Sequence, residues 1–88
     1  MDNIWKPTED KMYNIEVISY LFENDQAVIY VNMQGEKDNI GNLRVTYPSL
    51  VSKVKKAMEI GYKPPFFARI QYTGKNAKDQ LLFKMWVE

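Results

Sequence analysis

The chain has 88 residues, 45% of them apolar or aromatic, and a formal net charge of +1. This length accommodates one domain, and this apolar content excludes an intrinsically disordered chain. The chain contains no cysteine and no histidine, which excludes disulfide bonds, thiolate chemistry and most zinc sites. No apolar run approaches the ~20 residues of a membrane span, and residues 1–7 lack a signal-peptide pattern, so we expect a cytoplasmic protein with no membrane partner.

Charge is divided unevenly along the chain. Residues 1–39 carry three lysines and eight acids, a net charge of −5, whereas residues 40–87 carry nine Lys or Arg and two acids, a net charge of +7. A basic half can attract a polyanion. The alternative is that the two halves interleave in the fold, so that their charges mix on the surface.

Residues 1–11 are polar, and we expect them to form an N-terminal arm ahead of a single domain over residues 12–88. Ile4 and Trp5 are the exceptions in this arm, because a large apolar side chain in a tail usually packs against the body of the protein.

The next segment predicts a β-hairpin. Residues 12–22 alternate between apolar and polar side chains and then lose the alternation, which predicts a long strand with a bulge or bend near Ile18 and Ser19. Residues 23–26 predict a turn, and the β-branched, alternating residues 27–33 predict the returning strand.

The spacing of apolar residues changes after a polar loop at residues 34–42 and a short third strand at residues 43–47. Apolar residues recur at helical spacing and predict a helix over roughly residues 48–60. Pro48 suits the first turn, Thr46 or Ser49 could cap it, and Gly61 follows its end. The apolar face comprises Leu50, Val51, Val54, Ala57 and Met58.

Two further strands complete the pattern. Pro64 and Pro65 prevent continuation of the helix. Residues 66–72 and 81–87 alternate as strands, separated by a basic, glycine-containing loop at residues 73–79.

This order, β-β-β-α-β-β, and the size of the chain resemble the five-stranded oligonucleotide/oligosaccharide-binding (OB) barrel over residues 12–88. The implied fold class is mainly β with one helix; a β-grasp-like α+β fold is the alternative. The resemblance rests on element order and on no specific motif. Small single-domain barrels of this kind in phages and mobile elements often coat single-stranded DNA, so the resemblance implies that partner as an expectation.

Alternation assigns the two faces of each strand. The purely apolar sets are expected inside: Ile15 and Val17; Ala27, Ile29 and Val31; Leu43 and Val45; Ala68 and Ile70; Leu81, Phe83 and Met85. The outward sets then place an aromatic ring beside a cation or amide on three strands. Single-strand binders combine stacking rings with cations that neutralise phosphates. The candidate nucleic-acid-binding residues are therefore Tyr30, Arg44, Phe67, Arg69, Lys75, Lys78, Lys84 and Trp86.

Each of these assignments has a structural alternative. Phe67 and Trp86 could be buried under the helix or the arm, and the lysines of the 73–79 loop could serve solubility alone. The helix lysines 53, 55 and 56 are expected to form a solvated face.

The sequence predicts neither an enzyme nor a cofactor, because the commonest general base and nucleophile pairings are absent. Residues 36–39 carry oxygen ligands without the spacing of an EF-hand loop, which leaves at most a weak cation site. The main hypothesis is a module that binds single-stranded DNA. The alternative is a protein-binding module, such as an inhibitor of a host enzyme or a replication accessory factor, whose acidic half docks on a basic partner. A third is a homo-oligomer that pairs through its last strand.

Overall fold

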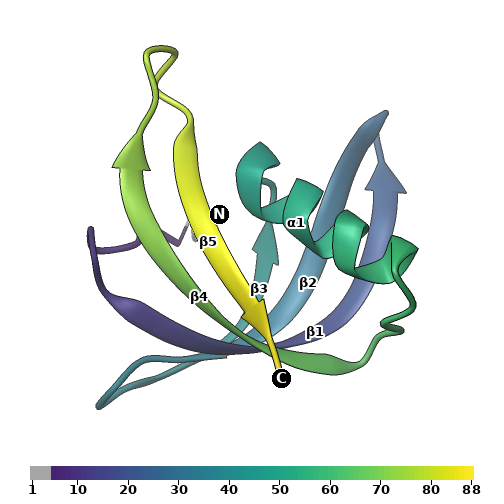
Figure 1. Ribbon diagram of the computed structural model, residues 1–88, viewed down its shortest axis with the longest axis horizontal. Helices are drawn as coiled ribbons and strands as arrows, with labels where there is room; N and C mark the ends of the chain where they lie inside the picture. The colour runs from purple at the N-terminus through teal and green to yellow at the C-terminus, as the bar shows by residue number, and fades with distance from the viewer. Residues whose placement is uncertain (1–4) are drawn as a thin grey trace.

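A computed structural model describes residues 5–88 as one antiparallel sheet and one helix (Figure 1). Ile4 and the remainder of residues 1–4 lie outside the described residues. The predicted order is confirmed, and the elements are β1 (Met12–Glu23), β2 (Gln26–Gln34), β3 (Asn39–Val45), α1 (Pro48–Glu59), β4 (Phe66–Lys75) and β5 (Leu81–Val87). The third strand begins earlier than predicted, because Asn39, Gly41 and Asn42 of the expected loop pair with β2. It also ends earlier, and Tyr47, which precedes Pro48, occupies the N-cap position of the helix.

β1 is the strand that joins the two sides of the sheet. Its first half pairs with β4, and nearly its whole length pairs with β2. The predicted irregularity is confirmed: the register with β2 shifts between Val17 and Ser19, leaving Ile18 as the extra residue of a bulge. The predicted turn is confirmed as well, since Asn24 and Asp25 both have positive φ, as a two-residue hairpin turn of type I′ requires.

The strand order across the sheet is β3-β2-β1-β4-β5. Among the described residues β3 and β5 are edges with no ladder between them, so the predicted closure into a barrel is not confirmed. Contacts between β5 and the beginning of α1 lie beside this gap. The backbone N–H of Phe83 on β5 donates to Ser49 Oγ at 3.1 Å, and the ring centroids of Tyr47 and Phe83 lie 5.7 Å apart.

Helix α1 lies across the open side of the bent sheet and packs mainly against β5 and β2 (Figure 1). Pro48 occupies its first turn as predicted. Neither Thr46 nor Ser49 caps the helix by a side-chain hydrogen bond: Tyr47 occupies the N-cap position, and Ser49 accepts from Phe83. Gly61 ends the helix at φ +117°, with N–H bonds from Gly61 and Tyr62 to the carbonyls of Met58 and Ala57. Within residues 5–88, no helix is both long and apolar enough to cross a membrane.

The core lies between the concave face of the sheet and the apolar face of α1. Every residue that alternation assigned to the inside is buried or packs against this core. Tyr13, Met33, Phe66 and Tyr72 are buried with them.

The N-terminal arm contacts this core through Trp5. Its ring stacks on Phe83 at 5.8 Å and meets Tyr13 edge-on at 5.2 Å. The hydroxyl of Tyr47 donates to the carbonyl of Trp5. Packing of Trp5, expected from the sequence, is therefore observed.

Candidate nucleic-acid interface

The convex face of the sheet carries six of the eight candidate side chains. Pairing register places Arg69 of β4 directly opposite Trp86 of β5, and Arg44 of β3 directly opposite Tyr30 of β2. Phe67 lies two residues before Arg69, and Lys84 lies two residues before Trp86, so both share this face. Lys75 ends β4 and Lys78 lies in the following loop; both are exposed.

The aromatic rings of Phe67 on β4 and Trp86 on β5 are exposed to solvent. Phe67 is 57% exposed and Trp86 is 48% exposed, so neither is covered by the helix or by residues 5–11 of the arm. Among the described residues Arg69 makes no ion pair. We refer to Phe67, Arg69, Lys84 and Trp86 as the β4–β5 face.

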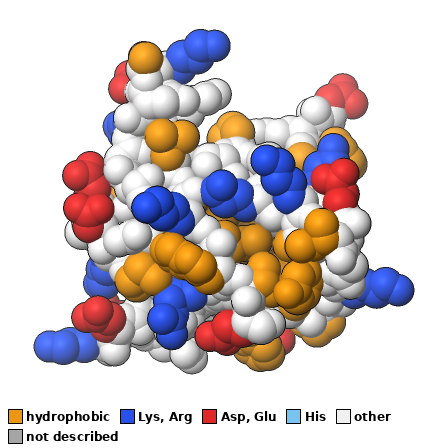
Figure 2. Space-filling model, in the orientation of Figure 1, with side chains coloured by type: hydrophobic (Ala, Val, Ile, Leu, Met, Phe, Trp, Pro, Cys, Tyr) orange, Lys and Arg blue, Asp and Glu red, His pale blue; other side chains and the backbone are white. Residues whose placement is uncertain are grey.

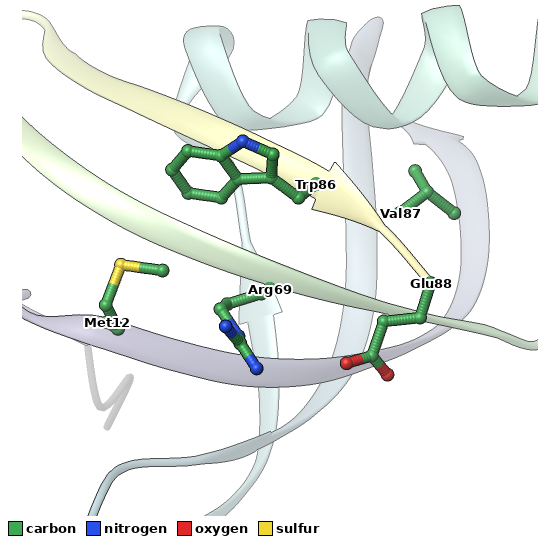
Figure 3. Close-up of a pocket in the computed structure, with 5 residues that line it drawn as sticks. All are labelled: Met12, Arg69, Trp86, Val87 and Glu88. Atoms are coloured by element: carbon green, nitrogen blue, oxygen red, sulfur yellow. The ribbon is translucent and has the colours of Figure 1, made fainter.

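A hollow of about 490 Å³ adjoins this face and is lined by Met12, Arg69, Trp86, Val87 and Glu88 (Figure 3). Met12, Arg69 and Trp86 come from three adjacent strands, and the guanidinium of Arg69 and the carboxylate of Glu88 both extend toward β1 (Figure 3). The backbone N–H of Glu88 donates to the carbonyl of Phe67 at 3.0 Å, which fixes the end of the chain against β4.

The corresponding pair on β2 and β3 is held by a third residue. Arg44 Nε donates to Glu23 Oε1 at 2.9 Å, and the Tyr30 hydroxyl donates to the same carboxylate at 2.8 and 3.0 Å. We refer to Glu23, Tyr30 and Arg44 as the Glu23 cluster. These hydrogen bonds lower the pKa of Glu23, with the bond from Arg44 the larger cause, and they raise the pKa of both Tyr30 and Arg44. Arg44 and Tyr30 are thus already engaged by an acid.

The loop between β4 and β5 is shaped by Asn76 rather than by its lysines. Asn76 Oδ1 accepts from the backbone N–H groups of Lys78 and Gln80 at 2.8 and 3.0 Å. This Asx arrangement fixes the turn and leaves the side chains of Lys75 and Lys78 projecting from it.

Cations gather on the side of the molecule that carries α1 and β5. Figure 2 shows a row of Lys and Arg side chains across this face, beside apolar atoms. Between residues 48 and 87 the only acids are Glu59 and Asp79. The cations of residues 48–87 therefore lie on neighbouring elements, since α1 packs on β5 and β5 pairs with β4.

A second hollow, of about 370 Å³, occupies the middle of the convex face. Apart from Phe67 and Arg69, its lining residues were not among the predicted site residues. The polar ones are Asn14, Glu16, Asn32, Gln34 and Glu88, and Ile15 and Ala68 complete the lining. Strand alternation already marked Asn14, Glu16 and Asn32 as outward. Their convergence depends on the pairing of β1 with β4 and β2, which alternation does not reveal.

Comparison with protein families, with curated proteins and with solved structures gave no match. The resemblance to OB domains therefore continues to rest on element order.

Proposed function

We propose that this chain is a non-catalytic module that binds single-stranded DNA along the β4–β5 face. The observation that carries the proposal is the direct opposition of Arg69 and Trp86, with Phe67 beside them and both rings exposed. Bases can stack on two such rings while the guanidinium between them contacts phosphate or stacks on a base. Each stacked base contributes about 1–3 kcal/mol.

The surrounding charge supports the same assignment. Lys84 continues the face along β5, and Lys75 and Lys78 extend from the adjoining loop. The lysines of α1 lie beyond β5 and add long-range attraction for a polyanion. Binding through these groups releases counterions, so affinity is expected to fall steeply with salt.

The strand order and the helix between β3 and β4 support an OB-like architecture that is open between β3 and β5. OB domains bind along strands 2 and 3 and through the loops that join strands 1 to 2 and 4 to 5. In this chain the loop after β4 is basic, but the β2–β3 surface is occupied by the Glu23 cluster. The proposed path is therefore displaced toward β4 and β5.

Fluorescence anisotropy of a labelled single strand of about 30 nucleotides, beside the matched duplex, tests the proposal at about 50 and 200 mM salt. The double variant Arg69→Ala, Trp86→Ala is expected to weaken binding about tenfold or more, because a stacking ring and a cation are lost. The matched variant Tyr30→Ala, Arg44→Ala removes the same types of group from the other strand pair and is expected to change affinity about twofold at most.

Circular dichroism would establish that both variants are folded. Absence of binding by the native protein at low salt would contradict the proposal, as would equal affinity for single strand and duplex.

A second candidate, a module that binds another copy of the same chain, is favoured by a different observation. Large apolar side chains are exposed at the end of β1 and at the end of α1, with Phe22 71% and Ile60 79% exposed. Leu21, next to Phe22, is also 45% exposed, and neighbouring exposed apolar side chains commonly mark interaction surfaces. Sedimentation velocity of the native protein beside a Phe22→Ser, Ile60→Ser variant tests a second copy as the partner: concentration-dependent association of the native protein alone would support it.

A further inference from the structure

The hollow in the middle of the convex face combines three kinds of group. Phe67 provides an exposed ring, Asn14, Asn32 and Gln34 provide carboxamides, and Glu16 provides a carboxylate. Glu16 lies directly opposite Phe67 across the β1–β4 ladder and directly opposite Asn32 across the β1–β2 ladder. The volume of the hollow, about 370 Å³, falls within the range of small-ligand sites, about 300–1,000 Å³.

Glu16 has no partner in the described part of the chain: no hydrogen bond or ion pair to its side chain is formed within residues 5–88. Glu16 is a half-buried residue that lines the hollow, and its carboxylate oxygens are free to accept hydrogen bonds from a ligand. A carboxylate accepts and cannot donate when ionised, so a matching ligand must present N–H or O–H groups.

Acids and cations around the hollow favour different parts of a nucleotide. Glu16 and Glu88 repel phosphate from the middle of the hollow, whereas Arg69 on its wall and Lys84 further along the β4–β5 face attract it. A strand crossing this surface would therefore turn a base inward over Phe67 and keep its backbone toward the cations. The carboxamides then reach the edge of the inserted base.

Resting on the proposed function, we infer that this hollow accepts a guanine, stacked on Phe67 and recognised by Glu16. Guanine is the common base whose Watson–Crick edge has two adjacent donors, N1–H and N2–H, which match the two oxygens of a carboxylate. Adenine, cytosine and thymine each present a donor next to an acceptor, which a carboxylate pairs with only in part. Asn14 or Asn32 supplies an N–H donor for guanine O6.

The test is fluorescence anisotropy with labelled oligothymidylate of about 12 nucleotides, carrying at one central position dT, dG, dA, dC or deoxyinosine. The native protein is expected to bind the dG strand roughly tenfold more tightly than the all-dT strand, as for one bidentate base contact. Deoxyinosine, which lacks the N2 amino group, is expected to lose most of this gain. The dG strand carries a single guanine, which prevents the formation of guanine quadruplexes.

The variant Glu16→Gln is expected to abolish the dG preference and to leave affinity for the all-dT strand within about twofold of native. Glu36→Gln, which makes the same charge change in the loop between β2 and β3, is expected to retain the preference. Equal affinity for all five strands would overturn the guanine site while the proposed function stands, and so would a dG preference that persists in Glu16→Gln. Absence of binding to every strand would overturn the proposed function and the guanine site together.

Discussion

In two strand pairs of this sheet an aromatic residue lies directly opposite an arginine, but the two pairs differ in their surroundings. Tyr30 faces Arg44 across β2 and β3, and Trp86 faces Arg69 across β5 and β4. In the first pair the carboxylate of Glu23, at the end of β1, accepts hydrogen bonds from both side chains. In the second, no acid within residues 5–88 pairs with Arg69, and the ring of Trp86 is half exposed. An aromatic–arginine pair is thus a structural contact or an open surface according to a third residue.

The largest expected effect comes from placing an acid on the open pair. Lys84→Glu reverses a charge beside Trp86 and provides a carboxylate near Arg69, as Glu23 does for Arg44. Affinity for a single strand at low salt is expected to fall more than about tenfold, because a phosphate contact becomes a repulsion. Anisotropy titration measures this effect.

Lys37→Glu is the control for that variant, since it makes the same change in net charge in the loop between β2 and β3. It should lower affinity far less. Equal losses in the two variants would show that only the overall charge matters and would remove the distinction between the two strand pairs.

A smaller effect is expected from the opposite change. Glu23→Gln removes the acid that engages Arg44 and Tyr30, so the second strand pair should become available to phosphate. Affinity for a single strand of about 30 nucleotides is expected to rise about two- to threefold at low salt. Asp25→Asn, in the adjacent turn, is the matched control, and an equal rise in that variant would argue against a specific role for the Glu23 cluster.

Acid is expected to weaken the hydrogen bonds of the Glu23 cluster by protonating its carboxylate. Because the pKa of Glu23 is lowered in the folded state, its contribution to stability is present above the ordinary carboxylate pKa and is lost as pH falls through the lowered value. The melting temperature of the native protein should exceed that of Glu23→Gln by a few degrees at most near neutral pH, and the gap should vanish in strong acid. A gap that is independent of pH would contradict an ionic origin.

The smallest effect is spectroscopic. The bond to Glu23 is the first cause of the raised pKa of Tyr30, so this phenol should ionise at a higher pH in the native protein than in Glu23→Gln. Tyrosinate absorbance during alkaline titration, with a Tyr30→Phe variant subtracted to isolate the signal, measures the difference. Identical curves for Tyr30 in the two proteins would show that the phenol does not sense the carboxylate.

Local patterns in the sequence predicted most of the fold. The bulge at Ile18, the two-residue turn at Asn24 and Asp25, and the glycine end of α1 each depend on a few neighbouring residues. The open gap between β3 and β5 could not be predicted in this way, because the pairing of edge strands depends on contacts between residues far apart in the sequence, such as the hydrogen bond from Phe83 to Ser49 across 34 residues.

The candidate site shows the same division. Alternation predicted that Phe67, Arg69 and Trp86 face outward, and all three are exposed. It could not predict that Arg44 pairs with an acid 21 residues away. Nor could it place Glu16 opposite Phe67, because that register is fixed only when β1 and β4 pair. Single residues reveal the face they occupy, whereas their partners depend on the assembled sheet.

The two tryptophans of the chain occupy contrasting environments. Trp5 lies against Phe83 and Tyr13 and is partly buried, whereas Trp86 is half exposed beside Arg69. Acrylamide should therefore reach the indole of Trp86 more readily than that of Trp5, and the emission of Trp86 should lie further to the red. The fluorescence of Trp5 therefore reports on the packing of the N-terminal segment, and that of Trp86 reports on the convex face. A Trp86→Phe variant would separate the two signals without any added dye.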